Sequence, residues 1–215
     1  MTGRTLVIAQ QKGGSGKTTL AAHLAVAFSR KLRVAILDVD PQGSLGQWFE
    51  IRERRVGEDA TGLILRTASG WGAKREARSL ARDHDLVLID MPPRSDLEAR
   101  NVIESADLIA IPVQPTPVDL WATQATLEIA ERGGPPAVIV INRAPSRAQT
   151  TAQLIAKLAE LGAESLTARI GNRVAFGSTM GIGSTVMEAF PGSKAAEEIE
   201  AVAAELQGHL DVAAP

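Results

Sequence analysis

A glycine-rich segment near the N-terminus, KGGSGKTT at positions 12–19, links two runs of very different composition. The run before it, residues 5–10, is apolar and β-branched, which is typical of a buried strand. The run after it, residues 18–30, is rich in alanine and leucine and favours a helix. In such a strand–turn–helix unit, backbone N–H groups and the positive end of the helix dipole face the turn. The segment therefore predicts a phosphate-binding loop in an α/β fold.

Two side chains at the end of this loop supply what a nucleoside triphosphate needs. Lys17 is placed to reach the β- and γ-phosphates, and Thr18 offers a hydroxyl to Mg²⁺. We therefore predict ATP and Mg²⁺ as the cofactors. The other loop positions expected to bind ATP are Gly13, Gly14, Ser15, Gly16 and Thr19.

The loop departs from the common pattern at one position. G-x-x-x-x-G-K-[ST] would place a glycine at position 11, where this chain has Gln11 followed by an additional lysine, Lys12. The string resembles the deviant Walker A motif, KGGxGK[ST], of the ParA/MinD family of ATPases. That resemblance implies that Lys12 reaches across a dimer interface to the partner's nucleotide and acts in catalysis beside Lys17. The alternative interpretation is a solvated loop lysine next to an ordinary phosphate loop.

Short apolar runs recur along the chain and alternate with helix-forming segments, and the hydrophobic content of 45% is ample for a core. Such runs are typical of parallel strands that helices cover on both faces. They comprise residues 5–10, 34–37, 86–89, 108–113 and 137–141, with a shorter run at 165–170. The expected helices comprise residues 17–30, 74–82, 96–105, 117–132, 150–161 and 193–210. We predict an α/β fold with a single doubly wound, mostly parallel sheet and helices on both faces, in one P-loop ATPase domain over residues 1–215.

Acidic side chains follow two of these runs, at the edge where parallel strands place ligands. Asp38 and Asp40, in the segment DVDPQGS, are two residues apart, so on extended backbone they point the same way. The segment resembles the DxDPQG motif of ParA-type proteins, which implies that Asp40 orients the attacking water and that Asp38 lies near the metal. Asp-Pro and Gln-Gly also favour a turn, which could itself aim the carboxylates. Asp90, which ends LVLID, is the carboxylate expected to hold a water on Mg²⁺.

Asn142 follows the apolar run VIVI. The family resemblance implies that it hydrogen-bonds the adenine edge, and an amide can both donate and accept there. Capping of the strand-to-loop turn is an equally good interpretation of Asn142. The segment IPVQPTPVD, residues 111–119, resembles the proline bend that borders the dimer interface in relatives, although its prolines also suit the end of a strand and the start of a helix.

The composition excludes several kinds of site. The chain has no cysteine, which rules out disulfides, thiolate metal sites and iron–sulfur clusters. Its three histidines have no ligand spacing, and aromatic residues, at 3%, are too few for a stacking platform for single-stranded nucleic acid. Because we find no signal-peptide pattern and no apolar run of membrane length, we expect a cytoplasmic protein without a membrane partner.

The same absences separate the branches of the ParA/MinD family. Without cysteine the chain lacks the cluster ligands of nitrogenase iron protein, and without tyrosine it lacks the tail of related bacterial tyrosine kinases. The C-terminal segment GHLDVAAP has neither lysine nor arginine, unlike the membrane-binding helix of MinD. The phosphate loop begins at residue 12, too close to Met1 for the helix-turn-helix domain of longer ParA proteins. We therefore expect a small ParA-type ATPase.

Such a resemblance implies a weak Mg²⁺-dependent ATPase that forms a homodimer around ATP, binds nucleoid DNA without sequence preference and is reset by a partner. Its role would be to partition or position plasmid, chromosome or protein-cluster cargo, with a ParB-like or cargo-adaptor protein stimulating hydrolysis. The net charge of −2 gives no global basic field, so DNA binding would need a local basic patch. The candidate patches are Arg52, Arg54, Arg55, Arg66, Lys74, Arg75, Arg78 and Arg82, and separately Arg147, Lys157, Arg169, Arg173 and Lys194. The alternative is a same-fold ATPase that acts as a division-site regulator or metallochaperone-type enzyme without DNA binding.

Overall fold

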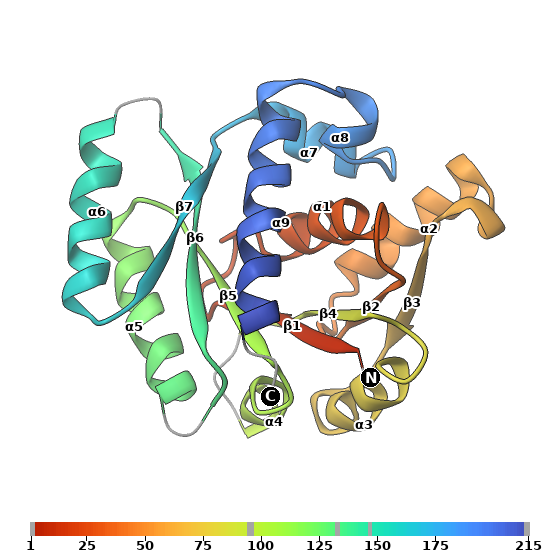
Figure 1. The fold of residues 1–215 in the computed structure, drawn as a ribbon, viewed down its shortest axis with the longest axis horizontal. Coiled ribbons are helices and arrows are strands. Elements are labelled where there is room, and N and C mark those ends of the chain that lie inside the picture. The colour runs from red at the N-terminus through yellow and green to blue at the C-terminus, as the bar shows by residue number, and fades with distance from the viewer. Residues whose placement is uncertain (1–2, 94–96, 132–133, 146–147, 213–215) are drawn as a thin grey trace.

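Seven parallel strands form one sheet in the computed structural model, which describes residues 3–93, 97–131, 134–145 and 148–212. The strand order is β3-β2-β4-β1-β5-β6-β7, and each neighbouring pair runs parallel (Figure 1). The strands are β1 (Arg4–Ile8), β2 (Val34–Asp38), β3 (Leu63–Thr67), β4 (Leu86–Asp90), β5 (Leu108–Val113), β6 (Ala137–Ala144) and β7 (Glu164–Gly171). The predicted doubly wound α/β fold is confirmed.

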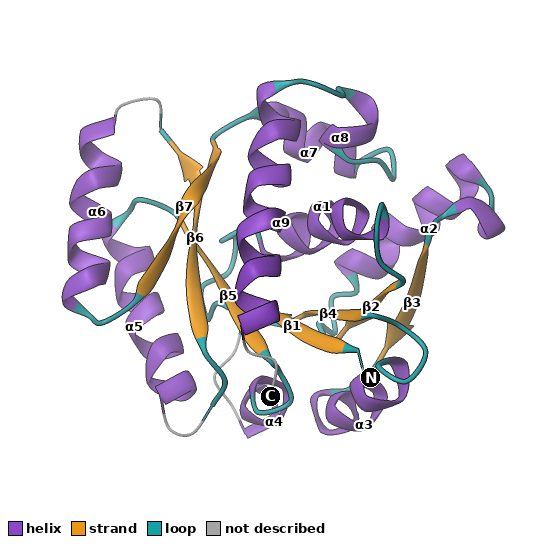
Figure 2. Ribbon diagram, in the orientation of Figure 1, coloured by secondary structure: helices purple, strands orange, loops and turns teal. Residues whose placement is uncertain are grey.

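Helices cover both faces of the sheet, as the alternating sequence pattern predicts (Figure 2). One layer holds α1 (Lys17–Ser29), α2 (Ser44–Val56), α7 (Val174–Met180), α8 (Val186–Ala189) and α9 (Lys194–Val212), with the short 3₁₀ helix η1 (Glu58–Ala60) following α2. The other layer holds α3 (Gly70–Leu80), α4 (Leu97–Ile103), α5 (Pro117–Glu131) and α6 (Ala148–Glu160). Among the described residues, no helix is both long enough and apolar enough to span a membrane.

The strand side chains divide the core into two parts, one on each side of the sheet. In β1, Leu6 and Ile8 belong to the part beneath α1 and α9, whereas Val7 belongs to the part beneath the opposite helices. All three are fully buried. This period of two is what a strand buried on both faces requires, and it explains why the strands read as continuous apolar runs in the sequence.

The sequence-based prediction missed β3 and the helices α2, α7 and α8. β3 is an edge strand paired with β2 alone, and Ile64, Arg66 and Thr67 lie exposed on it. An edge strand needs no continuous apolar run, because solvent covers one side of it. The sequence of α2 predicts a basic stretch rather than a helix. Its inward face consists of four buried residues, Leu45, Trp48, Phe49 and Arg52.

The sheet brings the ends of distant strands to one edge. The chain order reverses at β1, which lies between β4 and β5 in the centre of the sheet. In an open parallel sheet, ligands bind outside the carboxyl ends of the strands at such a reversal. The glycine-rich loop follows β1, Asp38 and Asp90 are the last residues of β2 and β4, Asp40 lies in the loop after β2, and Asn142 lies near the end of β6.

Candidate nucleotide-binding site

The glycine-rich loop turns the chain from β1 into α1. Gly14 and Gly16 have φ angles of 76° and 94°, and α1 begins at Lys17. Only glycine adopts this left-handed backbone without strain, so the two glycines are what make the turn. Lys17 is buried, and its Nζ donates a hydrogen bond to the carbonyl of Lys12 at 3.3 Å. Burial lowers the pKa of the Lys17 ammonium, while Asp90 and Asp40 act in the opposite direction.

Thr18 and Asp90 meet beside this lysine. The Thr18 hydroxyl donates to Asp90 Oδ2 at 2.6 Å, which joins the start of α1 to the end of β4. Burial raises the pKa of Asp90 to about 7, so near neutral pH its carboxyl is poised between its two charge states.

The oxygen atoms at this point fit a hydrated Mg²⁺. Asp90 Oδ1 and Ser15 Oγ are buried and have no hydrogen-bond partner among the described residues. A hydroxyl and one carboxylate are the hard donors that Mg²⁺ uses when phosphates and water complete its shell. In the described part of the chain, no three His, Asp or Glu side chains gather to hold a metal by themselves.

The loop after β2 is folded around Asp38. Its Oδ1 accepts the N–H of Asp40 at 3.0 Å and its Oδ2 accepts the N–H of Gly46 at 3.0 Å. Burial raises the pKa of Asp38. Asp40 in turn accepts the N–H of Gln42 at 2.9 Å, and it borders the same cavity as Lys17 and Thr18. Asp38 thus holds the turn that points Asp40 toward the phosphate loop; its predicted role near the metal stays a prediction.

Asn142, at the end of β6, is tied into the protein at both ends of its amide. Nδ2 donates to the Ser15 carbonyl at 2.8 Å, and Oδ1 accepts the N–H of Arg143 at 2.9 Å. Arg143 has a φ of 50°, and the pairing of β6 with β7 shifts register between Ile141 and Ala144. The bond to Ser15 makes Asn142 a brace between β6 and the phosphate loop. Its predicted contact with adenine stays a prediction.

Lys12 is not a solvated loop lysine. Its ammonium forms an ion pair with Asp119 on α5, and the Asp119 side chain is fully buried. The Gln114 amide, in the β5–α5 turn, donates to the carbonyl of Gly14 at 2.8 Å. The proline-rich segment 111–119 therefore holds the glycine-rich loop from one side.

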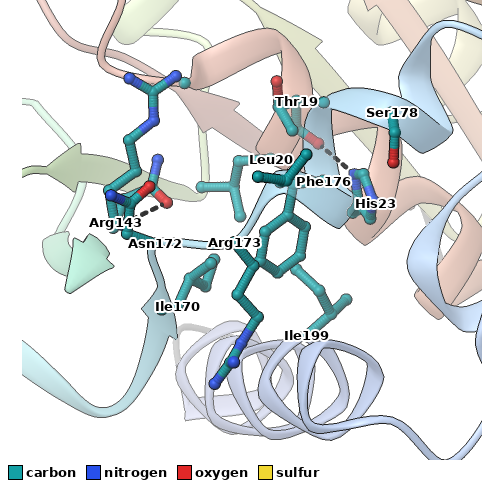
Figure 3. Close-up of a pocket in the computed structure, with 15 residues that line it drawn as sticks. Thr19, Leu20, His23, Arg143, Ile170, Asn172, Arg173, Phe176, Ser178 and Ile199 are labelled. Atoms are coloured by element: carbon teal, nitrogen blue, oxygen red, sulfur yellow. Dashed lines mark hydrogen bonds between the residues drawn. The ribbon is translucent and has the colours of Figure 1, made fainter. Parts of the chain in front are cut away.

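Two adjoining cavities lie along α1. The first has a volume of about 540 Å³ and is lined by the glycine-rich loop, Asp40 and Trp48, among others. The second, of about 480 Å³, lies between α1, the ends of β6 and β7, and α7 (Figure 3). Gly16, Thr19, Arg143 and Gly177 line both. A cavity at the phosphate loop with a second one adjoining it offers room for the phosphates and the base of a nucleotide.

The second cavity is the part of the site that sequence analysis missed. Ile170, Asn172 and Phe176 come from the end of β7 and from α7; Phe176 packs against His23 of α1, and Asn172 lies beside Arg143 (Figure 3). Its walls are largely apolar, as a site for the flat face of a base requires. The signal was present in the sequence, because Asn172 is a polar residue two positions after the run 165–170.

A phosphate loop at the reversal of a doubly wound sheet, with a buried lysine, a threonine and an aspartate beside it, defines a P-loop nucleotide-binding protein. The sequence matches the family described as CobQ/CobB/MinD/ParA nucleotide binding domain over residues 6–213, and the chain belongs to this family.

Relatives within the family include partition and positioning proteins. The chain is 30% identical to maintenance of carboxysome distribution protein A of Halothiobacillus neapolitanus over 205 residues, which cover 92% of this chain and 94% of that protein. It is 28% identical to the chromosome-partitioning ATPase Soj of Thermus thermophilus, with 98% of each chain covered.

Solved structures share the fold. An ATP complex of an aspartate-to-alanine variant of Cyanothece McdA superposes with a TM-score of 0.78 at 22% identity, over 96% of this chain and 97% of that chain. The cell division ATPase MinD of Pyrococcus furiosus gives a TM-score of 0.79 at 21% identity, over 96% and 99% of the two chains.

The Gly16→Ala variant is expected to be less stable than wild type by roughly 1–2 kcal/mol, because a side chain at this left-handed position is strained. A Cβ at Gly16 would also collide with the Asn142 amide nitrogen. Gly13→Ala is the matched control, since its Cβ would meet no atom within 4 Å and its φ is not positive. Urea unfolding without nucleotide measures the stability of both variants and of wild type. Equal stability of the two variants would contradict the assigned loop geometry.

His23 predicts a pH dependence of folding stability. Burial lowers its pKa from 6.5 to about 4. Between these values the unfolded chain binds the proton and the folded chain does not, so stability is complete above pH 6.5 and is lost as the pH falls toward 4. The shift corresponds to roughly 3 kcal/mol. In His23→Gln this part of the acid destabilisation should vanish, which unfolding curves of both proteins between pH 4 and 7 measure. If the unfolding free energies of the two proteins fall in parallel between pH 7 and pH 4, His23 does not cause the acid destabilisation.

Proposed function

We propose that this protein is an ATP-dependent dimerising switch that partitions or positions plasmid, chromosome or protein-cluster cargo. The observation that carries the proposal is a glycine-rich loop with two lysines, of which Lys17 faces its own phosphate cavity and Lys12 is turned away from it toward α5. Relatives that match over nearly the whole chain are named for carboxysome distribution and chromosome partitioning. The same role would place this protein in the cytoplasm, on the nucleoid.

The reaction we propose is ATP hydrolysis to ADP and phosphate. Lys17 binds the phosphates, Thr18 and Asp90 hold Mg²⁺, and Asp40 orients the attacking water. When bound, Mg²⁺ neutralises charge that develops on the transferred phosphoryl group. A lysine supplied by the partner, Lys12, completes the site in the place that an arginine finger takes in other enzymes. Because that group comes in trans, hydrolysis by the isolated chain is weak.

Dimerisation with ATP tests this proposal directly. Size-exclusion chromatography with light scattering should show a monomer without nucleotide and a dimer with ATP and Mg²⁺. Lys12→Gln should bind ATP and remain monomeric. A wild-type chain that stays monomeric with saturating ATP would refute the proposed ATP-dependent dimer.

A basic side chain that is buried or already paired with a carboxylate is less available to a DNA phosphate, and several candidates are of this kind. Arg52 is buried and pairs with Glu188, and Arg55 contacts the same carboxylate. Arg173 and Lys194 pair with neighbouring glutamates on α9. Arg147 lies outside the described residues. The DNA-binding patch therefore has to be assigned to the remaining basic residues.

We propose that non-specific duplex DNA binds along α3. Lys74, Arg75, Arg78 and the adjacent Arg82 form no ion pair within the described part of the chain, and Trp71 on the same helix is 64% exposed. Lysine and arginine side chains on one helix can follow the phosphate backbone without reading sequence. A dimer would present this surface twice.

The double variant Arg75→Glu/Arg78→Glu should bind DNA more weakly than wild type in the presence of ATP. Losing two phosphate contacts should lower the slope of log affinity against log salt by about 2. Gel shift with random duplex DNA, with and without ATP, at several salt concentrations measures this. Lys157→Glu/Arg169→Glu, in the other candidate patch, is the matched control. If the control loses affinity and the α3 variant does not, the surface is misassigned; no binding by wild type would favour the same-fold regulator or metallochaperone-type enzyme.

A partner that stimulates hydrolysis completes the cycle. ParB-like proteins and cargo adaptors are the class we propose, and the carboxysome and chromosome relatives are named for such different cargoes. Stimulation of ATP turnover by the product of a neighbouring gene identifies the partner.

A further inference from the structure

The ammonium of Lys12 has a defined acceptor within its own chain. It pairs with Asp119, whose side chain is 0% exposed, while the Lys12 side chain is 29% exposed. Asp119 also accepts the Thr116 hydroxyl and, at 3.3 Å, the backbone N–H of Gln114. Among the described residues, Lys12 is the one cation paired with this buried carboxylate.

A second contact fixes the same part of the loop. The Gln114 amide donates to the Gly14 carbonyl at 2.8 Å, so the β5–α5 turn holds the glycine-rich loop at position 14 while α5 holds it at position 12. The backbone of Lys12 also accepts the Lys17 ammonium at 3.3 Å. Lys12 therefore lies between its own catalytic lysine and α5, and its side chain is directed to α5.

This arrangement competes with the role that the proposed function gives Lys12. To reach the nucleotide of a second copy, the ammonium has to leave Asp119, and a carboxylate sealed from water would lose its counter-ion. Breaking a buried pair in this way is costly, because one charge stays behind in a medium of low polarity. Dimerisation is then coupled to the rupture of one specific ion pair.

We propose that Asp119 is a positioning residue that holds Lys12 in cis and sets a threshold for ATP-dependent dimerisation, an inference that rests on the proposed function. The ammonium moves only when the partner offers an acceptor with more negative charge than one carboxylate. A triphosphate is such an acceptor. Chains that carry no nucleotide keep Lys12 on Asp119 and stay monomeric.

Asp119→Asn tests this directly, because the amide keeps the size of the side chain and its one oxygen can still accept the Thr116 hydroxyl, while the hydrogen bond from the Gln114 N–H to the other carboxylate oxygen is lost. The variant lacks the negative charge that retains Lys12. We expect its ATP-bound dimer to dissociate about tenfold less readily, equivalent to 1.4 kcal/mol. Sedimentation velocity across a protein concentration series, with ATP, with ADP and without nucleotide, measures the dissociation constant.

Asp85→Asn is the matched control. Asp85 pairs with Arg33 at the amino ends of β4 and β2, away from the glycine-rich loop, and the Arg33 and Asp85 side chains are 68% and 41% exposed. Its dimer should match wild type, so any general effect of removing one negative charge appears there as well.

The outcomes distinguish a failure of the proposed function from a failure of the role proposed for Asp119. If wild type does not dimerise with ATP, the proposed function fails and Asp119 has no threshold to set. If wild type dimerises and Asp119→Asn dimerises equally, Asp119 sets no threshold and the proposal is refuted. If Asp119→Asn dimerises more weakly, the proposal is also refuted, and Asp119 acts within the dimer instead. A double-mutant cycle of Lys12→Gln and Asp119→Asn on the unfolding of the nucleotide-free chain tests the pair itself. Additive effects there would refute it.

Discussion

The Lys17→Ala variant should bind ATP about 100-fold more weakly than wild type, a loss of nearly 3 kcal/mol. Lys17 is the buried cation of the phosphate cavity, and its ammonium lies within a cradle formed by a left-handed glycine turn. Charge-assisted hydrogen bonds to phosphate are the strong ones, and burial removes the water that would otherwise compete. Titration calorimetry with ATP and Mg²⁺ measures the affinity.

Lys31→Ala controls for the loss of one positive charge, because Lys31 is exposed at the far end of α1. Its ATP affinity should stay within twofold of wild type, a difference of less than about 0.5 kcal/mol. Lys17→Ala should not lose folding stability without nucleotide, since a lysine with a lowered pKa is held there at a cost. If Lys17→Ala binds ATP normally, the phosphates lie elsewhere and the site assignment is wrong.

Asp40→Ala should hydrolyse ATP at least about 100-fold more slowly while binding it almost as well as wild type. Its carboxylate borders the phosphate cavity but makes no contact with the Lys17 side chain or the Thr18 hydroxyl among the hydrogen bonds of the described residues. A group that acts on water in the transition state affects turnover more than binding. Such a variant should accumulate as the ATP-bound dimer.

Single-turnover hydrolysis and light scattering on the same sample measure both effects. Asp59→Ala, an exposed aspartate in the η1 helix, is the matched control and should hydrolyse ATP at the wild-type rate. Full hydrolysis by Asp40→Ala would remove Asp40 from catalysis and transfer the role to another group. Loss of ATP binding would instead show that Asp40 shapes the cavity.

The parts of the fold that sequence predicted are those whose environment is uniform along the element. Strands β1, β2, β4, β5 and β6 are buried on both faces, so hydrophobicity alone identifies them. β3 was missed because edge strands keep polar side chains, and α2 was missed because charged residues dominate its exposed face. Arg52 illustrates the limit: it belongs to a run of basic residues, yet it lies buried against Trp48 and pairs with Glu188 of α8. Sequence cannot show a partner 136 residues away.

The sequence by itself determined the glycine-rich loop, the strand that precedes it, the helix that follows it and the carboxylates at the ends of β2 and β4. These features are local: left-handed glycine positions, a helix N-terminus and polar residues after apolar runs are written in consecutive residues.

Only the tertiary structure decided what lies across from that loop. It placed Asn142 on the carbonyl of Ser15, Phe176 and Asn172 in the second cavity, and Asp119 on Lys12. Each of these contacts joins elements more than 100 residues apart, and the sheet order that brings them together depends on long-range packing. Local patterns state which residues can bind a phosphate, whereas the energy of burying their partners decides where each side chain is held.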